Sequence, residues 1–165
     1  MNLKETENII NSLIDTFIQS GKTSLDLRKK GLKKKIKFDN TPVTNGDIAV
    51  NNLLTNKISD LTPNIQIISE ESSENKEKKN LKNFWLIDPI DGTYDYVHGK
   101  DEFTINAALI INKKPVAGII NAPDKNRLFY SFGLSNSFEI NNGLKKELTC
   151  RSEEHTSELQ SRTNL

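Results

Sequence analysis

An apolar run that stops at two carboxylates constrains this chain more than any other segment. Residues 84–93 read FWLIDPIDGT, in which Asp88 and Asp91 follow the apolar residues and precede Gly92 and Thr93. The apolar part is typical of a buried strand, which would deliver both carboxylates to one edge of a sheet. Carboxylate oxygens are the ligands that Mg²⁺ prefers, and backbone N–H groups at a helix start can hold a phosphate. The segment therefore predicts metal-assisted phosphoryl chemistry.

The same segment also has a structural interpretation. Asp-Pro and Asp-Gly are ordinary turn dipeptides, and an aspartate after a strand often caps the next helix. Other segments must therefore decide between the two interpretations.

Residues 65–71, IQIISEE, form a second short apolar run that ends in acid. If this strand is a neighbour of the first in one sheet, Glu70 can reach the same place as Asp88. Glu71 is expected only to begin a solvated charged loop over residues 72–82.

Residues 37–47, KFDNTPVTNGD, lead into an amphipathic run over 48–61. Thr44 and Asp47 have the spacing of a capping box, with Asp in place of the usual Glu or Gln. A structural role for this pair and a functional one are both open at this point.

In order and spacing, the three segments resemble the inositol monophosphatase superfamily of Mg²⁺-dependent, lithium-sensitive phosphatases. Its patterns are Lys-x-Asp-x-Ser/Thr-Pro-Val-Thr-x-Ala-Asp, a Glu-Glu pair after a strand, and Trp-Leu/Ile-Ile/Val-Asp-Pro-Ile/Leu-Asp-Gly-Thr. All three are present, with Gly46 where the family usually has alanine. Residues 39–44 and 102–106 look most like bacterial 3′(2′),5′-bisphosphate nucleotidases, whereas 96–99 look more like inositol monophosphatases.

The resemblance implies site roles for individual residues. Glu70, Asp88, Asp91 and the Ile90 carbonyl would be metal ligands, Asp47, Thr93 and Glu70 would be catalytic, Gly92 and Thr93 would bind phosphate, and Lys37 would support the substrate or the site. Two or three Mg²⁺ ions per active site of the intact protein would activate the attacking water.

The family pattern also contains a C-terminal Trp-Asp-x-Ala-Ala-Gly segment whose aspartate completes the second metal site. No tryptophan follows Trp85, so we expect residues 1–150 to be an N-terminal metal-binding α+β domain without its C-terminal α/β half, and with weak turnover or none. Residues 151–161 look like the translation of a sequencing-library adapter. We therefore expect 151–165 to be an artefactual or disordered tail.

The expected fold class is α+β, the layered helix and sheet N-terminal half of the inositol monophosphatase-like (sugar phosphatase) fold, with a mainly antiparallel sheet. Periodicity and turn residues predict helices over 4–20 and 45–60, a lysine-rich loop or irregular strand over 25–37, a helical turn over 92–97, and strands over 103–111, 115–121, 127–132, 137–140 and 146–149. One face of this domain should expose apolar surface that the missing half would cover, which favours aggregation or homodimerisation.

Composition bounds the remaining possibilities. The 23 basic and 22 acidic residues give a net charge of +1, which argues against a general nucleic-acid or membrane-surface binder. The single cysteine, Cys150, cannot form an internal disulfide. No apolar run is long enough to span a bilayer, and the N-terminus does not read as a signal peptide, so we expect a cytoplasmic protein.

Three hypotheses follow. The first is an Mg²⁺-dependent phosphomonoesterase that removes the 3′-phosphate from nucleotides like 3′-phosphoadenosine 5′-phosphate. The second is the same chemistry on an inositol phosphate or sugar phosphate. The third is a non-catalytic metal- or phosphate-binding module.

Overall fold

The computed structural model describes residues 1–36, 42–71 and 81–149. Its helices are α1 (Leu3–Lys30), α2 (Asn45–Leu61), α3 (Thr93–Val97) and the 3₁₀ turn η2 (Pro123–Lys125). Its strands are β1 (Lys34–Ile36), β2 (Pro42–Thr44), β3 (Gln66–Ser69), β4 (Phe84–Asp91), β5 (Thr104–Ile111), β6 (Lys114–Ala122), β7 (Arg127–Phe132), β8 (Asn136–Asn141) and β9 (Leu144–Glu147).

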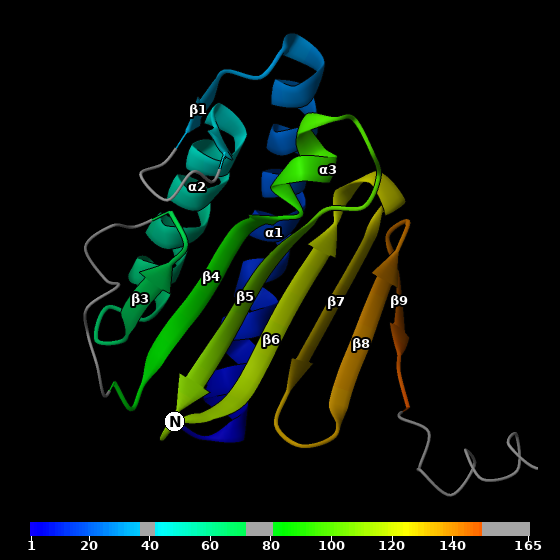
Figure 1. Cartoon of the computed structure of the whole chain (residues 1–165). Helices are drawn as coiled ribbons and strands as arrows, with labels where there is room; N and C mark the ends of the chain where they lie inside the picture. Colours follow the sequence, from blue (N-terminus) through cyan, green and yellow to red (C-terminus); the bar gives the residue numbers. More distant parts are fainter. Residues whose placement is uncertain (37–41, 72–80, 150–165) are drawn as a thin grey trace, which may run out of the picture.

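Strands β3 to β9 form one seven-stranded sheet in sequence order, and β1 pairs with β2 separately. Only β3 and β4 are parallel among the strand pairs of the described chain; the others are antiparallel. Figure 1 shows α1 and α2 packed on one face of the sheet. The predicted α+β architecture with a mainly antiparallel sheet is confirmed.

Helix α1 begins at a capping box. The Asn2 side chain accepts a hydrogen bond from the Glu5 backbone N–H at 2.9 Å, and the Glu5 carboxylate accepts one from the Asn2 backbone N–H at 2.9 Å. The capping box thereby satisfies two backbone donors at the start of the helix.

The predicted end of this helix at residue 20 was wrong, as was the loop assigned from residue 25, because α1 continues for ten more residues to Lys30. Ser20, at the predicted end, and Gly21 and Ser24, beyond it, are buried. They are too small to register as an apolar stripe, but they let the helix approach the sheet. A Cβ at Gly21 would lie 2.5 Å from Asn121 Nδ2.

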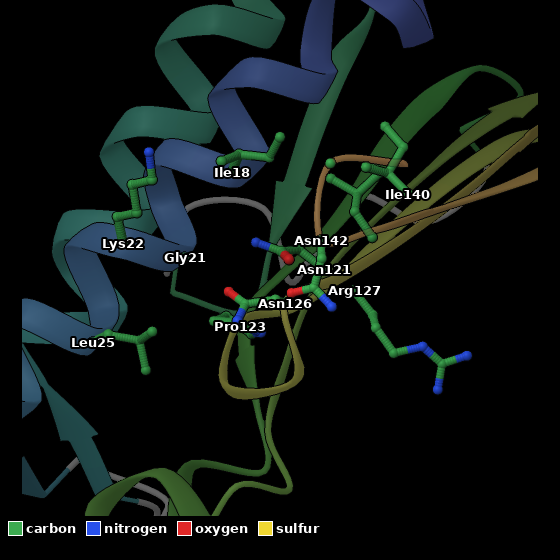
Figure 2. Close-up of a pocket in the computed structure, with 12 residues that line it drawn as sticks. Ile18, Gly21, Lys22, Leu25, Asn121, Pro123, Asn126, Arg127, Ile140 and Asn142 are labelled. Atoms are coloured by element: carbon green, nitrogen blue, oxygen red, sulfur yellow. The ribbon is translucent and has the colours of Figure 1, made fainter. Parts of the chain in front are cut away.

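Figure 2 shows the surroundings of Gly21, with Asn121 and Pro123 next to it. A hollow of about 390 Å³ lies here, between α1 and the ends of β6, β7 and β8. None of the predicted site residues lines it. The hollow is therefore distinct from the acidic strand ends described below.

The core lies between the two helices and the sheet. Alternation along β4 buries Trp85 and Ile87 on the helix side, and Trp85 Nε1 donates to Thr62 Oγ1 at 3.0 Å. The other buried side chains of this cluster include Ile10, Leu13, Phe17, Val50, Leu54, Ile58, Ile105, Leu109, Ile119 and Leu128.

The opposite sheet face exposes apolar side chains on β4 and β6 of the described chain. Leu86 of β4 is 49% exposed and Ile120 of β6 is 45% exposed. Ala108 and Gly118 lie in register beside Leu86 across β5 and β6. This agrees with the exposed apolar face expected from the sequence, whereas aggregation and homodimerisation stay predictions. No helix in the described ranges has both the length and the hydrophobicity to cross a membrane.

Phe17→Ala should lower the free energy of unfolding by about 3–5 kcal/mol, because it leaves a cavity between α1 and the sheet. Leu144, which is 77% exposed, provides the control, and Leu144→Ala should change stability by less than about 0.5 kcal/mol. Urea unfolding can be followed by the fluorescence of the single tryptophan, Trp85. Equal effects of the two substitutions would contradict the packing described here.

Candidate metal and phosphate site

The parallel pairing of β3 and β4 brings two acidic strand ends together. Ser69 lies opposite Ile87 in the register, and the Glu70 backbone N–H donates to the Ile87 carbonyl at 3.1 Å. Glu70 therefore follows β3 directly beside Asp88. The condition under which Glu70 can reach the same place as Asp88, that the two apolar strands are neighbours, is met.

A β-bulge places the second aspartate of β4. Asp88 lies opposite Asn106 and Asp91 opposite Thr104, so β4 has one more residue than β5 between these pairs. Residues three apart in a regular strand point to opposite faces, and a bulge re-aims the side chains that flank it. Pro89 has no N–H to offer the ladder, which is tolerated at a bulge.

Negative charge accumulates around Asp88. The pKa of Asp88 is raised to about 7, and burial is the largest cause. The charges of Glu70 and then Asp91, and a hydrogen bond with Glu70, raise the pKa further, whereas a hydrogen bond with the Ile90 backbone lowers it. Asp88 Oδ1 is buried and has no hydrogen-bond partner within the described residues. A half-buried carboxylate between two like charges is unfavourable unless a cation or a proton compensates it.

The chemistry of these residues fits a divalent cation. Glu70, Asp88 and Asp91 supply carboxylate oxygens, the donors that Mg²⁺ selects, and one of these oxygens is buried and unpartnered. No three His, Cys, Asp or Glu side chains in the described ranges are already gathered at metal-binding spacing. The three carboxylates repel one another, so a cation would supply the charge that draws them together.

Asp47 and Thr93 meet beside these strands. Asp47 is 1% exposed, and its Oδ2 accepts from the Thr44 backbone N–H at 2.8 Å and from Thr44 Oγ1 at 2.6 Å. Its other oxygen, Oδ1, lies 3.5 Å from Thr93 Oγ1, which is long for a hydrogen bond. Thr93 Oγ1 also donates to the Ile90 carbonyl at 3.1 Å.

The structural and functional interpretations of Thr44 and Asp47 are thus compatible. The capping box of α2 forms as the spacing indicated, and it uses one carboxylate oxygen of Asp47. The second oxygen stays directed at Thr93. The cap therefore fixes the orientation of the carboxylate through Oδ2 and leaves Oδ1 outside the cap.

Gly92 makes the turn from β4 into α3. Its φ of +85° lies in the left-handed region, and a Cβ there would be 2.9 Å from the Glu102 carbonyl oxygen. The close approach lets α3 begin immediately, with Thr93 as its first residue. Glycine is therefore required both by conformation and by space.

Asn106 contacts the candidate site, although the sequence interpretation did not assign it a role. It lies opposite Asp88 in the register, and its Nδ2 donates to Asp91 Oδ2 at 3.1 Å. The available signal was a polar side chain within the otherwise apolar strand 104–111. Lys37, which was expected to support the site, lies outside the described residues.

Comparison with known proteins decides the family. A profile of the inositol monophosphatase family matches residues 3–164. This chain belongs to that family. Among curated family members, the 3′(2′),5′-bisphosphate nucleotidase CysQ of Haemophilus influenzae is 35% identical over 145 residues, which are 87% of this chain and 54% of that protein. CysQ of Escherichia coli K12 is 35% identical over 116 residues, 70% of this chain and 47% of the protein.

Solved structures share the family fold. The suhB protein of Bartonella henselae superimposes with a TM-score of 0.71 at 23% identity, covering 87% of this chain and 54% of that one. An inositol monophosphatase/NADP phosphatase solved with Mg²⁺ and phosphate gives 0.68 at 22% identity, covering 82% and 51%. The family member described here spans about half the length of the relatives it matches.

The raised pKa of Asp88 predicts a stability effect that depends on pH. Because its pKa is 3.8 ordinarily and about 7 in the folded chain, the folded state binds more protons than the unfolded state between these values. Asp88 therefore makes the free energy of unfolding fall as pH rises through this window. Asp88→Asn should remove that contribution. In urea unfolding without metal, the free energy of unfolding of the variant should therefore rise relative to that of the unsubstituted chain between pH 4 and 7. A difference independent of pH would contradict the assignment.

Gly92→Ala should destabilise the chain more than Gly99→Ala. Both glycines have positive φ, +85° and +74°, but no atom lies within 4 Å of the Cβ position at Gly99. Both variants therefore have the backbone penalty of about 1–2 kcal/mol for a side chain at positive φ. Only Gly92→Ala also has the clash with the Glu102 carbonyl. Equal unfolding midpoints for the two variants would show that the approach to Glu102 is not restrictive.

Proposed function

We propose that this chain carries the metal-binding part of a phosphomonoesterase site that hydrolyses phosphate esters with a divalent cation, Mg²⁺ by preference. The observation that carries the proposal is the buried, unpartnered oxygen of Asp88 between Glu70 and Asp91. Glu70, Asp88, Asp91 and the Ile90 carbonyl would hold the metal. When bound, Mg²⁺ would polarise the phosphate and lower the pKa of a bound water.

Asp47 and Thr93 provide the proton-handling groups. A hydroxyl has one proton, so Thr93 can donate to Asp47 or to the Ile90 carbonyl, but not fully to both. With that proton committed, the lone pairs of Thr93 can accept a hydrogen bond from a water molecule and orient it. Asp47 is held in place by the α2 cap, so it can stabilise this arrangement without a change of rotamer.

The turn at Gly92 and Thr93 supplies the phosphate contact in this proposal. Gly92 brings the backbone close to the metal ligands, and Thr93 follows at the start of α3. Neither a serine nor a cysteine nucleophile is needed, because the attacking group is water. The side-chain amide of Asn106 donates a hydrogen bond to the Asp91 carboxylate and so holds its orientation.

For the substrate, we propose a nucleotide with a 3′-phosphate, such as 3′-phosphoadenosine 5′-phosphate. The support is the similarity to proteins named bisphosphate nucleotidases, at 35% identity over most of this chain. An inositol or sugar phosphate is the second candidate, favoured by residues 96–99 and by the fold shared with inositol monophosphatases. A metal- or phosphate-binding module without catalysis is the third, and the Thr93 hydroxyl beside Asp47 speaks against it. We place the enzyme in the cytoplasm.

Phosphate release from 3′-phosphoadenosine 5′-phosphate and from inositol 1-phosphate, with and without Mg²⁺, tests the proposal. Two proteins should be assayed: this chain, and residues 1–149 fused to the C-terminal half of the Haemophilus influenzae relative. We expect Mg²⁺-dependent release by the fusion, faster with the nucleotide, and little by the chain alone. Faster release from inositol phosphate would select the second candidate, and none from either substrate would refute the phosphatase assignment.

Asp91→Asn in the same fusion should reduce turnover below detection and weaken Mg²⁺ binding in calorimetry, because it removes a ligand charge but almost no volume. Asp60→Asn is the matched control, since it makes the same chemical change at an exposed position near the end of α2. Circular dichroism should show both variants folded. Full activity of Asp91→Asn would exclude Asp91 as a metal ligand.

A further inference from the structure

The side chain of Tyr96 joins the three helices next to the site. It is fully buried, and its hydroxyl donates to the Ser24 carbonyl of α1 at 2.7 Å. Burial, and then the charge of Asp47 in α2, raise the pKa of Tyr96 above its ordinary value. The phenol therefore stays protonated, and α3 is tied to α1 by a buried hydrogen bond.

Gly46 makes room for this hydroxyl at the start of α2. A Cβ at Gly46 would lie 2.4 Å from the Tyr96 hydroxyl oxygen, and 2.8 and 2.9 Å from Cε1 and Cζ of its ring. Gly46 does not have a positive φ, so space is the obstacle to a side chain here. Alanine would otherwise favour the helix.

Arg28 holds Tyr96 from another side. Its guanidinium carbon lies 5.8 Å from the centre of the Tyr96 ring and 5.4 Å from that of Phe103. The guanidinium is itself fixed by an ion pair with Asp124 at 2.6 Å and a hydrogen bond to the Lys100 carbonyl at 3.0 Å. The ring is therefore restricted on the α1 side and on the α2 side.

Tyr96 is three residues after Thr93, one helical turn along α3, and it touches the residue directly before Asp47. We infer that Tyr96 is a positioning residue that sets the separation of Asp47 and Thr93, and that Gly46 is the glycine that permits it. The roles of Asp47 and Thr93 rest on the proposed function. The contact between Tyr96 and Gly46 does not, and it can be measured without turnover.

The first test is a double-mutant cycle in this chain, with Gly46→Ala, Tyr96→Phe and both together, followed by urea unfolding. Gly46→Ala should lower the unfolding midpoint when residue 96 is tyrosine. The loss should be smaller when residue 96 is phenylalanine, because the closest contact, at 2.4 Å with the hydroxyl oxygen, is then gone, while the contacts with the two ring carbons remain. Additive effects would overturn the pairing.

Two control variants isolate the contact. Gly118→Ala adds the same methyl group where the nearest atom is 3.8 Å away, and Tyr130→Phe removes a buried hydroxyl that has no partner in the described residues. Neither should show coupling to the Gly46 and Tyr96 variants. Coupling of similar size in the controls would also overturn the pairing.

The second test separates positioning from general stability. The NMR signals of the Asp47 carboxyl carbon and the Thr93 backbone amide should shift or double in Tyr96→Phe. The amide of Leu128, in the distant strand β7, serves as the reference. If Tyr96→Phe lowers the midpoint but leaves the Asp47 and Thr93 signals unchanged, Tyr96 is structural only and the inference fails. These unfolding and NMR measurements need no turnover. A negative phosphatase assay would therefore refute the proposed function without affecting the test of the contact between Tyr96 and Gly46.

Discussion

The parallel pairing of β3 with β4 is the constraint on which the candidate site depends. Antiparallel neighbours place the end of one strand beside the start of the next, and only parallel neighbours bring two carboxyl ends to the same edge. Glu70 and Asp88 meet for this reason. The bulge at Pro89 then adds Asp91, and the antiparallel partner β5 contributes Asn106 from the other side.

Gathering these charges opposes stability. Each carboxylate raises the cost of ionising Asp88, and burial adds to it. Chains under selection for stability alone would place such groups in solvent. A local conflict of this kind, in a sheet whose other strands follow simple alternation, is typical of a functional site.

The sequence predicted the elements whose signal is local. Helix α2, the strand 84–91 and the hairpins after residue 103 follow from periodicity and turn residues. The second part of α1 was missed because Ser20, Gly21 and Ser24 carry its packing, and small residues leave no apolar stripe. Asn106 and Tyr96 were not recognised because their roles depend on register and on contacts between separate elements. Gly46 was noticed as a departure from the family pattern, but its reason, the Tyr96 hydroxyl, is visible only in three dimensions.

The contact between Gly46 and Tyr96 also restricts the order in which related sequences can change. A chain with glycine at 46 and phenylalanine at 96 has only a small void, which costs little. A chain with alanine at 46 and tyrosine at 96 has two groups in the same space. The combination of alanine at 46 with tyrosine at 96 should therefore be rare among homologues, and the two positions should vary together.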